Sequence, residues 1–178
     1  MQIDRIWAPW RLEYVQGDKK TPLSDEAKRG LLPGADPDCF LCQCVADPDD
    51  RERMVIEHRE HSLTVLNRYP YNNGHLLISP REHLAGLEDL TTEVQFELTE
   101  TIGRMVELLK RVLHPQGFNI GLNLGLAAGA GLPGHLHWHV VPRWNGDTNF
   151  MPALAGINVI PQSLDALWEA LIQELQKG

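Results

Sequence analysis

The sequence has no uninterrupted apolar stretch close to the roughly 20 residues that a membrane-spanning helix needs, so we expect no membrane partner. The first residues, Met1–Trp10, lack the continuous apolar segment of a signal peptide, which predicts a cytoplasmic location. Positive charge is also scarce, because 16 Lys and Arg stand against 24 Asp and Glu, for a formal net charge of −8. This deficit argues against a nucleic-acid polymer as partner, since basic surfaces bind phosphate backbones. The net negative charge is still compatible with binding of a small anionic ligand.

Cysteine is scarce as well, and its three copies cluster at positions 39, 42 and 44. In a chain expected in a reducing compartment, such a cluster favours metal binding over a disulfide. Cys39 and Cys42 form a Cys-x-x-Cys pair. Cys44 does not fit that spacing, and we expect it to be a core or incidental residue.

The length of 178 residues suits one domain with a sizeable core. We expect a single domain over residues 1–178. Its N-terminal arm, over about residues 1–38, begins with an aromatic-rich stretch that includes Trp7, Trp10 and Tyr14. We expect this stretch to pack on the body or on a partner subunit.

The pattern of apolar residues predicts strands and two long helices. The strands fall at 54–58 and 62–66, which form a hairpin, and at 75–79 and 118–124. The helices fall at about 91–112 and 163–176, and Thr91 or Thr92 is a candidate cap for the first. Residues 16–38 have the composition of a loop, and 47–53 of a charged turn. The expected fold class is α+β, with an antiparallel β-sheet, a long central helix and a C-terminal helix.

Three histidines alternate with apolar residues in Gly134-His-Leu-His-Trp-His-Val-Val-Pro142. On a β-strand this alternation puts His135, His137 and His139 on one face, and Leu136, Trp138 and Val140 on the other. Three imidazoles on one face suit a site that handles phosphate, a metal or both. The plainer alternative is a polar strand face that happens to be rich in histidine.

The same segment resembles the histidine triad (HIT) family, in which histidines alternate with apolar residues before two further apolar residues. Three more segments match that family in order and spacing: Asn67…Gly74-His75-Leu-Leu-Ile-Ser-Pro80, then Arg81-Glu-His83, then Asn119-Ile-Gly-Leu-Asn123-Leu-Gly125. The flanking sequences are similar to bacterial HIT proteins that act as ATP adenylyltransferases or diadenosine tetraphosphate phosphorylases. The resemblance implies the HIT fold and a homodimer.

The resemblance also implies nucleotidyl transfer at an α-phosphate, with His137 as the nucleophile that becomes a covalent nucleotidyl-histidine. Imidazole suits this role because it is a good nucleophile near pH 7 and a reversible leaving group. His139 would contact phosphate, His75 would support the cluster, and Asn123 would hold a phosphate or bridging oxygen. The implied reaction is phosphorolysis of diadenosine tetraphosphate to ATP and ADP, with inorganic phosphate as the second substrate.

Four further residues are candidates for nucleotide binding. By resemblance, Asn67 would face the ribose hydroxyls. Gly129 and Gly131 lie in a Gly/Ala-rich loop whose backbone N–H groups could approach the phosphates closely. Many family members have a Gln, Ser or Thr near this loop, whereas this chain has Ala130, Gly131 and Leu132 there. Arg143 is a candidate cation near the phosphates, although a surface Arg after a strand is the stronger explanation for it.

The resemblance to metal-binding members of the family implies a zinc site with four ligands, namely Cys39, Cys42, His83 and His135. Four protein ligands of this type suit a structural zinc ion with no open position for water. Such an ion would tie the N-terminal segment to the histidine strand.

Three alternatives stay open at this point. Water instead of phosphate would make the protein a hydrolase of dinucleoside polyphosphates or nucleoside phosphoramidates. His135, His137 and His139 could instead bind one catalytic zinc. The protein could also bind nucleotides without turnover.

Overall fold

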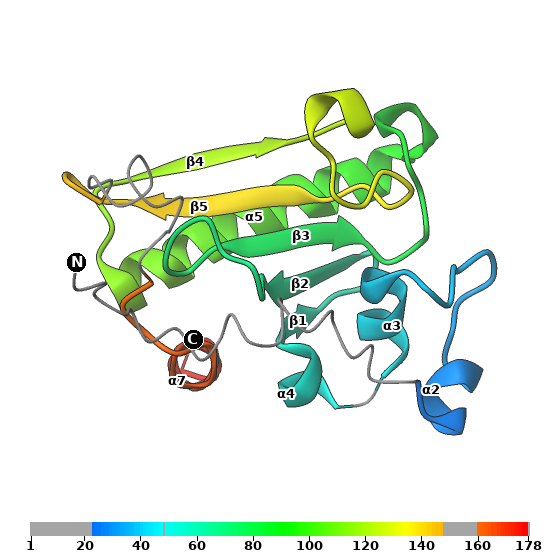
Figure 1. Ribbon diagram of the computed structural model, residues 1–178, viewed down its shortest axis with the longest axis horizontal. Coiled ribbons are helices and arrows are strands. Elements are labelled where there is room, and N and C mark those ends of the chain that lie inside the picture. Colours follow the sequence, from blue (N-terminus) through cyan, green and yellow to red (C-terminus); the bar gives the residue numbers. More distant parts are fainter. Residues whose placement is uncertain (1–22, 48, 148–159, 178) are drawn as a thin grey trace, which may run out of the picture.

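The computed structural model describes residues 23–47, 49–147 and 160–177 (Figure 1). Most of the predicted N-terminal arm, residues 1–22, lies outside this range. The elements in chain order are α2 (Asp25–Arg29), α3 (Phe40–Ala46), α4 (Asp50–Arg53), β1 (Val55–His58), β2 (Ser62–Leu66), β3 (Leu76–Pro80), η1 (Leu87–Asp89), α5 (Thr92–Leu113), β4 (Gly117–Leu122), η2 (Leu126–Ala128), β5 (Trp138–Arg143) and α7 (Leu164–Leu175).

The strands form one five-stranded sheet in the order β1-β2-β3-β5-β4, and every neighbouring pair is antiparallel. The predicted hairpin is confirmed in β1 and β2, and the α+β class is confirmed as well. The strand expected from His135 begins only at Trp138. The reason is local, since the backbone N–H of Leu136 donates to the Leu84 carbonyl at 2.7 Å, outside the sheet.

Helices α5 and α7 pack together and cover one face of the sheet (Figure 1). The side chain of Thr91 accepts from the backbone N–H of Val94 and caps α5, while Ser163 caps α7 in the same way. Leu136 and Val140 are buried in the core on this face, and Trp138 packs against it, as the alternation predicts. Among the described residues, no helix is both long and apolar enough to cross a membrane.

Helix α3 covers the opposite face of the sheet. Its buried residues Leu41 and Cys44 belong to a second core cluster with Leu63 and Val65 of β2. The loop prediction for residues 16–38 is wrong over α2, which the Ser24 side chain caps and the buried Ala27 anchors.

The turn predicted at residues 47–53 is wrong over α4. The Asp49 side chain accepts from the backbone N–H of Glu52 and starts this single helical turn. Helix α3 was not predicted either, and all three missed helices, of four to seven residues, are too short for apolar periodicity to reveal them.

Candidate active site and metal centre

A row of side chains crosses the sheet on the face covered by α3. His139 of β5 pairs with Leu77 of β3, and Leu77 pairs with Val65 of β2. Val65 in turn pairs with Val55 of β1. Since directly paired residues of a sheet share a face, the row runs from a histidine to apolar side chains.

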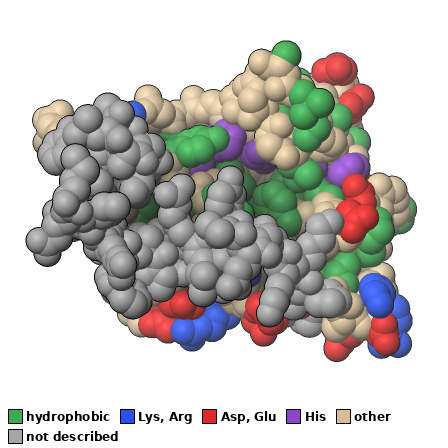
Figure 2. All heavy atoms as spheres, in the orientation of Figure 1, with side chains coloured by type: hydrophobic (Ala, Val, Ile, Leu, Met, Phe, Trp, Pro, Cys, Tyr) green, Lys and Arg blue, Asp and Glu red, His purple; other side chains and the backbone are tan. Residues whose placement is uncertain are grey.

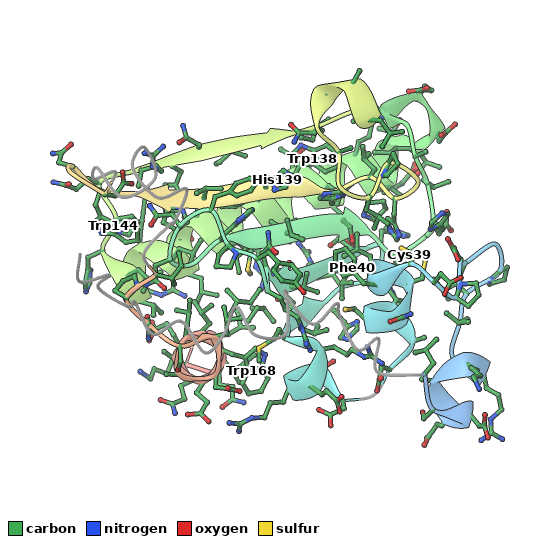
Figure 3. The ribbon with its side chains drawn as sticks, in the orientation of Figure 1. Cys39, Phe40, Trp138, His139, Trp144 and Trp168 are labelled. Carbon is green, nitrogen blue, oxygen red and sulfur yellow. The ribbon has the colours of Figure 1, made fainter. Side chains whose placement is uncertain are left out.

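A cavity of about 450 Å³ lies on this face, a volume typical of small-molecule sites. Phe40 comes from α3 and His139 from β5 (Figure 3), so the cavity lies between that helix and the sheet. Figure 2 shows histidine side chains between hydrophobic ones on the face viewed in Figure 1. The lining residues are Phe40, Gln43, Cys44, Arg53, Val65, Leu66, Asn67, Arg68, Tyr69, Tyr71, Leu77, Gly129, Gly131, Leu132, His137 and His139.

His137 lies in this cavity with one ring nitrogen fixed by the backbone. Its Nδ1 is 2.8 Å from the His135 carbonyl oxygen, which can only accept, so Nδ1 carries the hydrogen and donates it. In the neutral imidazole, the lone pair is then on Nε2. Only 7% of the residue is exposed. The geometry therefore suits a nucleophile held in one tautomer and orientation.

His75 and His139 form a directed pair. Nδ1 of His75 accepts from the backbone N–H of Tyr71 at 3.1 Å and from the side-chain amide of Asn67 at 3.2 Å. The hydrogen of His75 is therefore on Nε2, which donates to Nδ1 of His139 at 2.9 Å. His139 is left with a hydrogen on Nε2, and that group can donate to an anion.

Burial keeps both members of this pair neutral. It lowers the pKa of His75 to about 3, with further contributions from His139 and His137. Burial also lowers the pKa of His139, and His137 adds to the effect. At pH 7 the chain of hydrogen bonds is therefore built from neutral imidazoles.

Tyr71 is a site residue that the sequence analysis missed. Its ring lies 5.6 Å from that of His139 at an interplanar angle of 24°, and 4.7 Å from that of His75. It therefore covers both imidazoles while its own backbone N–H fixes His75. The available signal was a tyrosine four residues before His75, which we interpreted only as part of a turn.

The structure brings most of the predicted nucleotide-binding residues to this cavity. Asn67, Gly129 and Gly131 line it. Asn123 is not part of the lining, but its side-chain amide donates to the Gly129 carbonyl at 3.5 Å. Asn123 therefore contacts the loop that borders His137 and His139.

Arg143 lies elsewhere. It is four residues beyond His139 on β5, about 13 Å along an extended strand. Its guanidinium pairs with Asp147 at 2.7 Å and donates to Asn119 at 2.5 Å. Arg143 is therefore not among the residues that line the cavity. The described arginines that line the cavity are Arg53 and Arg68, which carried no motif in the sequence.

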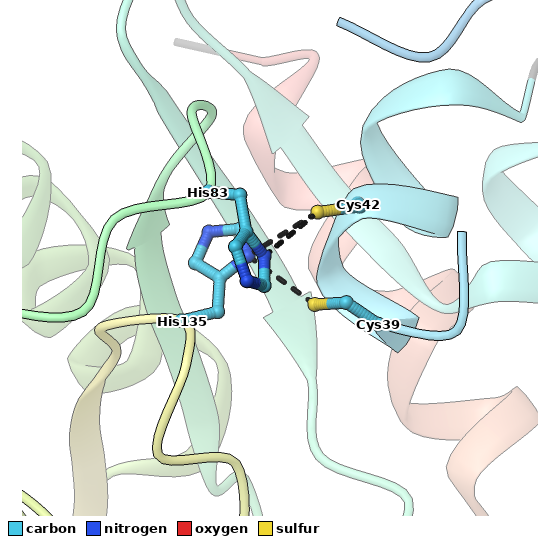
Figure 4. A group of neighbouring side chains, drawn as sticks. All are labelled: Cys39, Cys42, His83 and His135. Carbon is cyan, nitrogen blue, oxygen red and sulfur yellow. Dashed lines mark hydrogen bonds between the residues drawn. The ribbon is translucent and has the colours of Figure 1, made fainter. Parts of the chain in front are cut away.

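A separate group of possible metal ligands lies at the edge of α3 (Figure 4). Cys39 and Cys42 come from the start of this helix, His83 follows β3, and His135 precedes β5. Sγ of Cys39 is 3.3 Å from Nδ1 of His135, and Sγ of Cys42 is 3.2 Å from Nδ1 of His83. All four ligand atoms lie within 4.8 Å of one another.

The donor set and its protonation fit a zinc ion. Tetrahedral zinc, with sulfur at about 2.3 Å and nitrogen at about 2.0–2.1 Å, places sulfur and nitrogen about 3.5 Å apart. Nε2 of His135 donates to the Pro80 carbonyl at 2.9 Å, so its Nδ1 lone pair faces the sulfurs. Burial lowers the pKa of His135 to about 4 and raises that of Cys39 to about 12. A bound cation would favour the thiolate, which is the form that binds metal.

The three alternating histidines do not form one metal site among the described residues. His135 faces the cysteines, His139 bonds to His75, and His137 faces the cavity. Only two groups of described residues could hold a metal. One is the Cys₂His₂ group, and the other contains Glu60, His61 and Glu97. The alternative of a catalytic zinc on His135, His137 and His139 is therefore not supported.

Comparison with known proteins gives a consistent result. Residues 49–146 match the HIT domain family. The AP-4-A phosphorylase of Mycobacterium tuberculosis is 40% identical over 92% of this chain and 80% of that protein. The asymmetrical bis(5'-nucleosyl)-tetraphosphatase of Schizosaccharomyces pombe is 30% identical over 53% of this chain and 51% of that protein.

A solved structure is similar as well. A zinc-bound histidine triad family protein from Mycobacterium smegmatis superposes with a TM-score of 0.58 and 28% sequence identity. The match covers 70% of this chain and 84% of that one. The matched protein contains zinc, and this chain has a Cys₂His₂ group that could hold a metal.

Proposed function

The chain belongs to the HIT family and is an enzyme of the HIT type, and we propose that it transfers a nucleotidyl group through a covalent intermediate on His137. The observation that carries this proposal is the fixed tautomer of His137. Its Nδ1–H is held by the His135 carbonyl at 2.8 Å, which leaves Nε2 as a nucleophile in the cavity.

In the first step, Nε2 of His137 attacks the α-phosphorus of a dinucleoside polyphosphate. A P–N bond forms, the bond from that phosphorus to the bridging oxygen breaks, and the rest of the polyphosphate leaves with the electron pair. His139 supports this step because its Nε2–H can donate to a phosphate oxygen as negative charge develops. His75 and Asn67 hold His139 in the tautomer that makes this donation possible.

In the second step, inorganic phosphate attacks the same phosphorus, the P–N bond breaks and His137 is regenerated. With diadenosine tetraphosphate, the first step releases ATP and the second releases ADP. The identity to the M. tuberculosis phosphorylase supports phosphate as the acceptor. The relative from S. pombe, named as a tetraphosphatase, supports water as the alternative, which would make the enzyme a hydrolase.

We propose one orientation for the nucleotide in the cavity. The phosphate end belongs beside His137, His139 and the backbone of Gly129 and Gly131. The ribose belongs near Asn67 in the middle. Apolar side chains farther along suit a flat base.

We also propose that Cys39, Cys42, His83 and His135 hold a zinc ion. Bound by four protein ligands, the ion would supply structure and no open coordination position. It would connect α3 to the segment that carries His137. Cysteine ligands kept reduced in such a site would fit the proposed cytoplasmic location.

A homodimer is the proposed assembly, and the edge of the sheet supports it. In the described sheet β4 pairs with β5 on one side only, and its other side is an edge. Ile120, Leu124 and Leu126 are exposed on or just after this strand. A second copy could continue the sheet there and cover these apolar side chains.

The test is turnover of diadenosine tetraphosphate with and without inorganic phosphate, with nucleotides separated by chromatography. Formation of ATP and ADP only when phosphate is present supports the phosphorylase. Formation of ATP and AMP without phosphate supports the hydrolase. Tight nucleotide binding with no product in either reaction would contradict both and favour a binding protein.

A further inference from the structure

Among the described residues, a single hydrogen bond holds the imidazole of His139. Its Nδ1 accepts from Nε2 of His75 at 2.9 Å, which leaves the Nε2–H of His139 as the group that can donate to a phosphate. One hydrogen bond fixes one atom of a ring, but the ring plane can still turn about that bond. The direction of the Nε2–H therefore depends on a second contact that fixes the plane.

The strands on either side of β5 support this ring unequally. On the β3 side, His139 lies beside its bonded partner His75 and its paired residue Leu77. On the β4 side, the paired residue is Gly121, which has no side chain. A Cβ added to Gly121 would meet no described atom within 4 Å. Since paired residues share a face of the sheet, β4 leaves the imidazole unsupported on that side.

The ring of Tyr71 supplies the contact that is closest to parallel with His139. The two ring centroids lie 5.6 Å apart at an interplanar angle of 24°, within the range of favourable aromatic pairs. The other two rings that contact His139 are tilted more steeply, His75 at 43° and His137 at 67°. Of these three neighbours, Tyr71 is therefore the one that can fix the plane of His139 by stacking.

The loop that carries Tyr71 is itself attached to the sheet. The backbone N–H of Asn67 donates to the His75 carbonyl at 2.9 Å, and the backbone N–H of Tyr71 donates to Nδ1 of His75 at 3.1 Å. The side-chain amide of Asn72 donates to the Pro142 carbonyl of β5 at 3.1 Å. Because these anchors lie on both sides of Tyr71, they hold the ring in place although the residue is 56% exposed.

We propose that Tyr71 is a positioning residue, whose ring fixes the plane of His139 and so directs its Nε2–H toward the phosphate that reacts with His137. The inference rests on the proposed function for the identity of that phosphate, whereas the arrangement of the rings does not depend on it. A donor stabilises developing charge only when its N–H points at the oxygen that gains the charge. Loss of the stacked ring should therefore slow nucleotidyl transfer and leave nucleotide affinity almost unchanged.

The first test is single-turnover transfer of an adenylyl group from diadenosine tetraphosphate to the protein. Tyr71→Leu keeps apolar bulk without a flat ring, and we expect a transfer rate lower by roughly tenfold to a hundredfold, with almost the wild-type Kd for AMP. Tyr71→Phe removes only the hydroxyl and should react nearly as fast as wild type. Phe96→Leu is the matched control, because it replaces an exposed ring of α5 that does not line the cavity, and its rate should be unchanged.

The second test needs no turnover. Long-range proton–nitrogen NMR at neutral pH shows which ring nitrogen of each histidine bears the hydrogen. In wild type and Tyr71→Phe, His75 and His139 should each have it on Nε2. In Tyr71→Leu, the signals of His139 should broaden or move between those of the two tautomers, because a turning ring breaks its bond to His75. The signals of His137 should stay unchanged, because the His135 carbonyl holds its Nδ1–H.

Two outcomes would overturn the inference. One is a folded Tyr71→Leu that has the wild-type transfer rate or the wild-type signals of His139. The other is a Tyr71→Phe that reacts as slowly as Tyr71→Leu, which would assign the effect to the hydroxyl. Failure of the proposed function gives a different result, namely no adenylyl group on the wild-type protein while the signals of His139 still depend on the Tyr71 ring. That result would contradict nucleotidyl transfer and support the role of Tyr71.

Discussion

His75 makes the stability of this protein depend on pH in a way that can be calculated. An unperturbed histidine has a pKa of about 6.5, whereas burial lowers the pKa of His75 in the folded protein to about 3. As the pH falls below about 6.5, the unfolded chain binds a proton on this residue and the folded chain does not. The free energy of unfolding must therefore fall through the window from about pH 6.5 to about pH 3.

The size of the effect follows from the same two pKa values. Each pH unit inside the window corresponds to roughly 1.4 kcal/mol, so His75 alone should cost about 2 kcal/mol between pH 7 and pH 5. The residue is fully buried, so solvent does not screen the effect.

The perturbation is His75→Gln, which removes the titrating group and keeps an amide that can hydrogen-bond. We expect the variant to be less stable than wild type at pH 7, because Nε2 of His75 no longer donates to His139. Between pH 7 and pH 5, however, the variant should lose about 2 kcal/mol less than wild type.

The assay is equilibrium unfolding in guanidinium chloride at both pH values, in one metal buffer. His114→Gln, at an exposed histidine that ends α5, controls for replacing a histidine outside the cavity. Equal losses of stability by wild type and His75→Gln between pH 7 and pH 5 would refute the neutral, buried imidazole at position 75.

Three further predictions concern the metal group and the sheet edge. Cys39→Ser should lower zinc content and reduce Tm by about 5 °C or more, as expected for a loss of about 2 kcal/mol, while Cys44→Ser should keep its zinc. Unchanged zinc content and Tm in Cys39→Ser would remove the zinc proposal. Gly134→Ala should weaken zinc binding, because the added Cβ would lie 3.2 Å from Nε2 of His83; wild-type affinity in a zinc titration would contradict this. Ile120→Lys should produce a monomer in size-exclusion chromatography with light scattering, and an unchanged dimer would place the interface away from β4.

The fold followed largely from local patterns in the sequence. Apolar residues at helical spacing predicted α5 almost to its ends, and Thr91 was a candidate cap that the structure confirms. Alternation likewise predicted which side chains around His137 enter the core. Such patterns predict long elements well, because a long helix or strand places buried apolar side chains at the same spacing several times. Helices α2 and α4 contain a turn or so each, which is too short for any period to appear.

The site was predictable only where a motif marked it. The pattern around His137 pointed to the cavity, but no motif marked Tyr71, whose ring stacks on that of His139, or Arg53, which lines the cavity. Both contacts depend on how strands pair across the sheet, which is non-local information. Arg143 shows the limit of proximity in sequence, because four residues along β5 from His139 it pairs with Asp147 and does not line the cavity.

The most direct test of the central claim is detection of the nucleotidyl group on His137. The protein is mixed with diadenosine tetraphosphate in the absence of phosphate, quenched within milliseconds to seconds, and digested for mass spectrometry with fragmentation of the histidine-containing peptide. We predict an adenylyl group on His137, and no adduct and no turnover in a His137→Ala variant that still binds nucleotide. An adduct on another residue, or substantial turnover by His137→Ala, would contradict the covalent mechanism.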